Sequence, residues 1–292
     1  MCVLVRKSRK KKQSPIISFK QRLTDWLTLP WRRFQTFCYY IGLSVVVIAG
    51  FFAAYLIFFF RSLPDLESSS FESLKKRAQS QIEAKLEKSK QKLKWTPLKK
   101  IHRDLLYTVV FSEDSQFFEH DGVDFDAILA SAALNLKAGK YAYGASTISQ
   151  QVVKNLFLDH EKTLTRKLKE ILITQDLERS LTKNQILELY LNMAEFGPDL
   201  YGVQAAATYY FDKSPAQINA AEGAFMALML PSPRKNHYAI FQNQNLTRSK
   251  RKKLRRILRD MMHQEFISAS QYRNYRKYPY FKKTRRRGLA NH

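Results

Sequence analysis

The stretch that decides the fold runs over residues 113–170. It opens with EDSQFFEHDGVD (113–124), continues with GASTISQQVVKN (144–155) and closes with TLTRKLKE (163–170). Acids at its two ends enclose a Gly/Ser/Thr-rich turn and a cluster of Lys and Arg. A proton acceptor and a set of cations are the groups needed to move a sugar off a phosphate, because negative charge develops on the departing group.

The whole chain is strongly basic. Its 292 residues hold 50 Lys and Arg against 25 Asp and Glu, a formal net charge of +25. This balance predicts an anionic partner: nucleic acid, anionic lipid or a phosphorylated substrate. Both cysteines, Cys2 and Cys38, lie at or before the apolar segment described next, so the rest of the chain has no disulfide framework or Cys-based metal site.

An uncharged segment, FCYYIGLSVVVIAGFFAAYLIFFF, occupies residues 37–60. It is long enough to span a bilayer and is apolar all round, which fits a transmembrane anchor better than a buried helix or a cleaved signal peptide. Residues 1–36 form a basic segment in which Asp25 is the only acid. We therefore expect a single pass through the plasma (inner) membrane, with a cytoplasmic N-terminus and an extracytoplasmic, periplasmic domain. That location argues against nucleic acid as the partner.

The rest of the chain divides by composition. Residues 61–94 predict a connector and a charged helical stalk, whose apolar stripe rests on the bilayer or on the body of the domain. Residues 95–265 form the main domain, and residues 266–292 a basic tail, interpreted as a solvated end weakly attracted to anionic lipid. No alternating strand pattern follows the anchor, so the fold class is mainly α. The stalk stripe comprises Phe71, Leu74, Ala78, Ile82 and Leu86.

The first part of the deciding stretch combines acids with aromatic rings. Glu113 and Asp114 precede Phe117 and Phe118, and such acids are candidates for acid–base work, although a solvated loop start has the same spacing. His120 is lone and is interpreted as a structural hydrogen-bonding residue rather than a metal ligand. Asp124 is a candidate N-cap for an amphipathic helix marked by Phe125, Ile128, Leu129, Ala132 and Leu136.

The second part predicts a turn and a helix N-terminus, with Ser146 as the cap. Backbone N–H groups at such an end attract an anion, yet the P-loop spacing is absent, so no nucleotide site is supported. An ordinary capped helix explains the same pattern. Gly144 supplies the turn, and the polar residues here are Ser146, Thr147, Gln150, Gln151, Lys154 and Asn155.

The third part predicts a helix capped by Thr163. Arg166 and Glu170 are four residues apart and share a face, so they form either a structural ion pair or part of a functional cluster with Lys162 and Lys167. Convergence of cations beside an acid favours the cluster, because a pyrophosphate leaving group needs cations.

The first two segments, RKLKE (166–170) from the third, and KNQILELYLN (183–192) resemble four successive motifs of the family 51 glycosyltransferases. The family comprises peptidoglycan polymerases, found as domains of bifunctional penicillin-binding proteins and as free-standing enzymes. NMAEFG from Asn192, YGVQAAATYYF from Tyr201 and the absence of a transpeptidase region resemble the monofunctional biosynthetic transglycosylases. The likeness covers about residues 95–262.

The resemblance implies a role for each matched residue. Glu113 matches the general base, Asp114 the acid that shapes its site, and Glu170 the second essential acid beside the donor pyrophosphate. Lys162 stands where many relatives carry Arg, so its phosphate contact lacks the bidentate fork. The remaining substrate-binding positions are Lys154, Arg166 and Lys167 at the pyrophosphate, and Ser146, Thr147, Gln150, Gln151 and Asn155 on the donor side.

The implied activity is polymerisation of lipid II. The growing strand, carried on undecaprenyl pyrophosphate, is transferred with inversion to the 4-hydroxyl of the GlcNAc of lipid II. The implied fold is a lysozyme-like helical lobe with a small membrane-proximal lobe. No cofactor is required and no metal ligand is assigned, although a divalent cation (Mg or Mn) is expected to stimulate. Other cell-wall synthesis proteins are expected partners.

Two other readings of the sequence remain open. A membrane-anchored muramidase that cleaves peptidoglycan needs one proton-donating acid and no cationic cluster. A non-catalytic anchored binder of anionic polymers would act through charge alone, independently of Glu113 and Glu170.

Overall fold

Helices make up most of the described chain, which confirms the mainly α prediction. The computed structural model describes residues 19–66, 69–89, 91–139, 144–159, 161 and 163–281, and of residues 19–25, 27 and 28 it describes the backbone only. Two compact units result, Met1–Leu63 and Pro64–His292.

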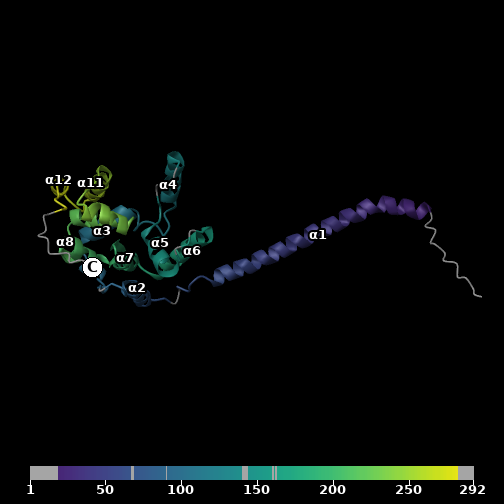
Figure 1. The fold of residues 1–292 in the computed structure, drawn as a ribbon, viewed down its shortest axis with the longest axis horizontal. Helices are drawn as coiled ribbons and strands as arrows, with labels where there is room; N and C mark the ends of the chain where they lie inside the picture. Colours follow the sequence, from purple (N-terminus) through teal and green to yellow (C-terminus); the bar gives the residue numbers. More distant parts are fainter. Residues whose placement is uncertain are drawn as a thin grey trace, which may run out of the picture. The chain divides into compact units, whose positions relative to one another are not determined.

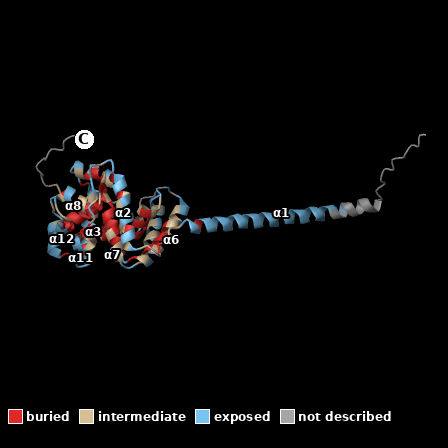
Figure 2. Ribbon diagram, turned by 90° about the horizontal axis from the view of Figure 1, so that it is seen from below, coloured by how far each residue is buried: buried red, intermediate tan, exposed pale blue. Residues whose placement is uncertain are grey.

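The described residues of the first unit form helix α1 (Phe19–Arg61) and the turn that follows it. The part of α1 from Leu29 to Arg61 is long and apolar enough to cross a membrane, and the predicted span 37–60 lies inside it. Side chains are exposed all along residues 29–58, as the pale blue of α1 in Figure 2 shows. Such a helix, apolar on every face and exposed over residues 29–58, matches a lipid-facing segment.

The second unit is a helical body (Figure 1). In chain order its elements are α2 (Phe71–Leu86), η1 (Leu98–Lys100), α3 (Arg103–Glu113), α4 (Phe125–Ala138), α5 (Ile148–Phe157), α6 (Leu164–Ser180), α7 (Lys183–Met193), β1 (Glu195–Gly197), β2 (Leu200–Tyr201), α8 (Val203–Phe211), η2 (Pro215–Gln217), α9 (Ala220–Met229), α10 (Pro233–Asn236), η3 (His237–Gln242), α11 (Arg248–His263) and α12 (Ala269–Tyr275).

The core is organised around α9, in which every residue is buried. It packs against α3, α8 and α11. The close approach of α3 requires Gly223, because a Cβ there would collide with the Thr108 side chain and lie 3.1 Å from the Leu105 Cα. The C-terminal end of α3, which carries Glu113, is therefore held by the most buried helix of the body.

A second group of helices comprises α5, α6 and α7, and its members α5 and α6 carry the second and third parts of the deciding stretch. The predicted stalk helix α2 packs on α7 and α5, with Leu74, Ala78, Ile82 and Leu86 buried. Its apolar stripe therefore rests on the body. The chain then enters α3 past α7, where Glu188 accepts hydrogen bonds from Trp95 Nε1 (2.9 Å) and from the Leu98 N–H (2.7 Å).

Several local features were not foreseen. The short antiparallel pair β1–β2 has too few residues to show alternation. Two separately capped elements follow Ser214: η2 ends at Gln217, and α9 begins anew with Asn219 as its cap. Within the described part of the tail, the Tyr280 ring is stacked on Phe225 at 5.5 Å. The basic cluster of the tail, Lys282, Lys283, Arg285, Arg286 and Arg287, lies outside the described residues.

Helix α4 has the predicted cap, Asp124, and the predicted apolar stripe, but none of its residues is buried. The exposed fractions are 61% for Phe125, 68% for Leu129 and 87% for Leu136. Figure 1 shows α4 projecting beyond the other helices of its unit. We call the side of α4 that carries Phe125, Leu129 and Leu136 the α4 apolar face.

Gly122 generates a stability prediction. Its φ is +86°, and a Cβ there would lie 2.7 Å from Glu178 Cγ and 2.8 Å from Thr174 Cγ2 on α6. Gly122→Ala should lower the free energy of unfolding by about 2–4 kcal/mol, since it adds a clash to an unfavourable backbone conformation. Urea denaturation measures the loss. Gly139→Ala is the control, because Gly139 has φ +60° and nothing within 4 Å of its Cβ position. Equal losses in both variants would contradict a role for the contact with α6.

Candidate active site

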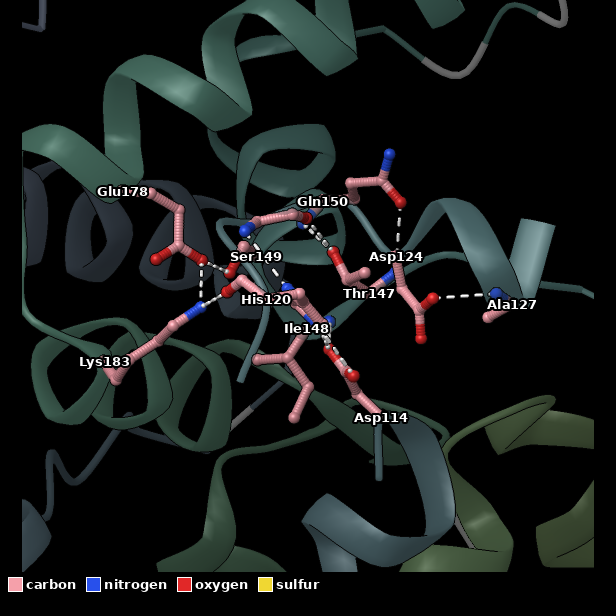
Figure 3. Close-up of polar contacts among 11 residues, drawn as sticks. Asp114, His120, Asp124, Ala127, Thr147, Ile148, Ser149, Gln150, Glu178 and Lys183 are labelled. Carbon is pink, nitrogen blue, oxygen red and sulfur yellow. Dashed lines mark hydrogen bonds and ion pairs between the residues drawn. The ribbon is translucent and has the colours of Figure 1, made fainter. Parts of the chain in front are cut away.

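Asp114 joins the first two segments of the deciding stretch, 113–124 and 144–155. It caps the C-terminus of α3, and its Oδ2 accepts a hydrogen bond of 2.9 Å from the Ile148 N–H at the start of α5. The ring of His120 lies 3.0 and 3.1 Å from the two carboxylate oxygens (Figure 3). His120 Nδ1 accepts from the Gly122 N–H, so Nε2 carries the proton donated to Asp114. The predicted structural role of His120 is confirmed, and the anion at the N-terminus of α5 is this buried carboxylate.

The cap of α5 is Thr147, so the prediction of Ser146 is wrong. Thr147 Oγ1 accepts from the Gln150 N–H (3.1 Å), while Gln150 Oε1 accepts from the Thr147 N–H (3.0 Å). This reciprocal box needs Gln three residues after the cap, a spacing that Ser146 does not have. Thr147 also donates to the Gly122 carbonyl (2.6 Å). Thr147 and Gln150 are buried, whereas Ser146 is exposed.

Lys183, the first residue of α7, holds the turn before α4 in place. Its Nζ donates to Glu178 Oε1 (2.7 Å) and to the His120 carbonyl (2.6 Å), and it lies 4.8 Å from the Phe117 ring centroid. Ser149 of α5 donates to the same Glu178 oxygen (Figure 3). Sequence reasoning assigned no chemistry to Lys183, Glu178 or Ser149. Their spacing gave no sign that three helices meet there.

Glu170 lies in a cluster of cations on α6. Its side chain is 3% exposed, with Arg166 Nη1 2.6 Å from Oε2 and Lys167 Nζ paired with Oε1. Thr163 caps this helix, as predicted. Lys154 of α5 lies in the same electrostatic environment. Burial lowers its pKa, Glu170 opposes that effect, and Arg166 and Lys167 add to it. We call Lys154, Arg166, Lys167 and Glu170 the cation cluster.

Glu113 is the last residue of α3, and its side chain is 10% exposed. Ser112 Oγ donates to Glu113 Oε1 (3.2 Å), and Lys253 Nζ of α11 lies 3.7 Å from the same oxygen. Tyr190 of α7 is near both acids, since burial first, and then the charges of Glu113 and Asp114, raise its pKa well above the ordinary value. Sequence reasoning missed Lys253, because it is one of many cations on α11.

Helix α5 runs from the end of α3, which carries Glu113 and Asp114, to the cation cluster around Glu170. Its first residue contacts Asp114, and Gln151 Oε1 accepts a hydrogen bond of 3.4 Å from Tyr190. Gln151 and Lys154 are three residues apart and share a face. Lys154 lies about 9 Å along the axis from Ile148, at 1.5 Å per residue. A proton acceptor and a cation cluster thus lie beside the same short helix.

The remaining predicted site residues are less informative. Asn155 is partly buried on α5, and Lys162 lies outside the described residues. Within the described ranges, no three His, Cys, Asp or Glu side chains could hold a metal ion together. Stimulation by a divalent cation stays a prediction.

A mainly helical body with one acid at a helix end and a second acid among cations is equipped for glycosyl transfer to or from a phosphate. The chain belongs to the transglycosylase family, whose model, described as Transglycosylase, matches residues 79–262. This match includes the helices that carry both acids and α11.

Three relatives bear the name biosynthetic peptidoglycan transglycosylase. The chain is 43% identical over 153 residues to the protein of Janthinobacterium sp. (strain Marseille), covering 52% of this chain and 66% of the relative. It is 43% identical over 171 residues to that of Chromobacterium violaceum, covering 59% and 73%. It is 36% identical over 208 residues to that of Haemophilus influenzae, covering 71% and 79%. The matched segment thus spans about two thirds to four fifths of these relatives.

The cation cluster predicts a coupled titration. Glu170→Gln should lower the pKa of Lys154 further, because the charge of Glu170 is what opposes burial and the two neighbouring cations. ¹³C NMR of reductively methylated protein, titrated with pH, measures this shift. Glu161→Gln is the control, since Glu161 is exposed just before α6 and is not among the charges acting on Lys154. An unchanged Lys154 titration in Glu170→Gln would show that the two groups are not coupled.

Proposed function

We propose that this protein polymerises peptidoglycan glycan strands from lipid II. The observation that carries the proposal is that Glu113 and the cation cluster lie beside the same helix, α5. Family membership and the names of the relatives support the same activity. The donor is the growing strand on undecaprenyl pyrophosphate, and the acceptor is a new lipid II.

At the acceptor end, Glu113 is the general base. It takes the proton from the 4-hydroxyl of the acceptor GlcNAc as that oxygen attacks C1 of the donor sugar. The new O–C1 bond forms on the face opposite the departing pyrophosphate, so the configuration at C1 inverts. Asp114 contributes through structure, because its hydrogen bond to α5 positions the end of α3.

At the donor end, the cation cluster stabilises the departing pyrophosphate. The C1–O bond breaks, and Lys154, Arg166 and Lys167 take up the developing negative charge, so no strong acid has to protonate it. Both carboxylate oxygens of Glu170 are already paired with Arg166 and Lys167. Glu170 therefore orients these two cations. Lys154 contacts no acceptor among the described residues, which leaves its ammonium group for the substrate.

The same geometry disfavours a muramidase. Bond cleavage by that route requires a protonated acid next to the glycosidic oxygen. Both oxygens of Glu170 are bound by cations, and Glu113 faces Lys253. Each acid thus lies beside cations, whereas a muramidase needs a proton-donating acid at the glycosidic oxygen.

The α4 apolar face and α1 suit a lipid-linked substrate. In this proposal α1 anchors the chain in the plasma membrane with its N-terminus in the cytoplasm, and the body lies on the extracytoplasmic side. The α4 apolar face lies in the outer layer of the bilayer, which removes its leucines from water. The undecaprenyl chains then stay in lipid while the sugars and pyrophosphates reach the body.

Glu113→Gln tests the proposed chemistry. The amide keeps the size of the side chain but cannot accept a proton, so lipid II polymerisation should fall by roughly 10²- to 10⁴-fold. Gel separation of labelled glycan strands measures the rate. Glu119→Gln is the control, since Glu119 is an exposed acid of the same segment. Full activity of Glu113→Gln, or release of muropeptides from finished peptidoglycan by the wild type, would contradict the proposal.

The double variant Leu129→Glu, Leu136→Glu tests the membrane contact of α4. In proteoliposomes it should raise KM for lipid II by about tenfold or more, because burying one leucine is worth about 1.5–3 kcal/mol. The value of kcat should change little. Ala130→Glu is the control, because Ala130 is exposed on a different side of α4. An unchanged KM in the double variant would place the α4 apolar face in water.

A further inference from the structure

Lys253 of α11 is partly buried and faces an acid of another helix, Glu113 of α3. The helix is fixed on α3 and α9 by the buried side chains of Leu254, Ile257, Leu258 and Met261. Lys253 lies at the edge of this buried side, with its side chain 26% exposed and its Nζ 3.7 Å from Glu113 Oε1. By contrast, Lys252 and Arg255 are exposed. Burial lowers the pKa of Lys253, Glu113 raises it, and Arg256 lowers it.

The two oxygens of Glu113 have different environments. Oε1 accepts from Ser112 and faces Lys253. Within the described part of the chain, no donor contacts Oε2. A carboxylate held at one oxygen presents the lone pairs of the other, and Oε2 is therefore the atom that can take a proton from a substrate.

The position of Glu113 also creates a need for a cation. It is the last residue of α3, where the negative end of the helix dipole disfavours a carboxylate, and Asp114 adds a second negative charge next to it. Tyr190 is neutral, and His120 is engaged with Asp114. Among the described side chains around Glu113, Lys253 is the cation in ion-pair contact, and Arg256 is a second cation on the same helix.

We propose that Lys253 is a positioning residue for the general base: it keeps Glu113 ionised and holds Oε1, so that Oε2 faces the acceptor hydroxyl. This inference rests on the proposed function, since it assigns Glu113 the role of base. It adds to that function a residue from α11, outside the motif segments that the sequence analysis matched.

Three variants of the full-length protein in proteoliposomes test the inference. Lys253→Met removes the charge and keeps the length, Lys253→Arg keeps the charge, and Lys252→Met is the exposed neighbour. Near neutral pH, Lys253→Met should lower kcat for lipid II polymerisation by roughly 10- to 100-fold, a part of the full contribution of a general base. KM should stay within about twofold, because a positioning residue for the base does not bind the substrate.

The pH profile separates this role from a purely structural one. In Lys253→Met the acidic limb of kcat/KM should move to higher pH by about one unit or more, because a cation within 4–6 Å favours an ionised carboxylate. Lys253→Arg should restore both the rate and the limb, and Lys252→Met should match the wild type.

Other outcomes would overturn the inference. A rise in KM at constant kcat would make Lys253 a substrate ligand, and a lower rate with an unmoved acidic limb would make it structural. Thermal unfolding identifies a folding defect, and if Lys253→Met does not fold, the profile of Lys253→Gln decides by the same criteria. Failure of the proposed function is a separate result: the wild type would not polymerise lipid II, or Glu113→Gln would remain active.

Discussion

The hydrogen bond from the Ile148 N–H to the Asp114 carboxylate is the interaction on which the site depends. It joins the end of α3 to the beginning of α5, and His120 joins both to the turn between them. A buried carboxylate that accepts such charge-assisted hydrogen bonds gains about 1.5–3 kcal/mol from each. Because α3 also packs against α9, the position of Glu113 at its end is fixed relative to α5, the helix that carries Lys154.

The two acids of the site differ in their surroundings, and this difference divides the chemistry between them. Glu170 has both oxygens bound by cations of its own helix, so it organises positive charge. Glu113 has one oxygen held and one left for a substrate. In the proposed mechanism, these two identical functional groups serve opposite ends of one reaction: one accepts a proton and the other arranges the groups that stabilise a leaving anion.

Positive charge has at least three separate uses in this chain. The cations around Glu170 form a compact cluster on α5 and α6. Lys183 of α7 donates hydrogen bonds to the His120 carbonyl, in the turn before α4, and to Glu178 of α6. Lys253 belongs to a helix whose other basic residues are mostly exposed. Net charge alone predicts only an anionic partner. Burial and ion pairing distinguish the lysines and arginines that contact particular acids or carbonyl groups from those that are exposed to solvent.

The sequence by itself determined the local features. Helix type, the caps at Asp124 and Thr163 and the apolar segment follow from periodicity and from short-range spacing, which need no long-range contacts. The motifs were matched by their resemblance to a known family. The assignment of Ser146 as a cap failed because two neighbouring hydroxyl residues compete, and only the spacing to Gln150 separates them.

The tertiary structure alone decided what depends on contacts between distant segments. It placed Lys253 beside Glu113, 140 residues earlier by the numbering, and left the apolar face of helix α4 exposed. It also showed that the anion bound at the start of α5 is the carboxylate of Asp114, which accepts a hydrogen bond from the Ile148 N–H. Spacing in a sequence does not reveal such pairs, because they form only when helices pack and water is excluded between them.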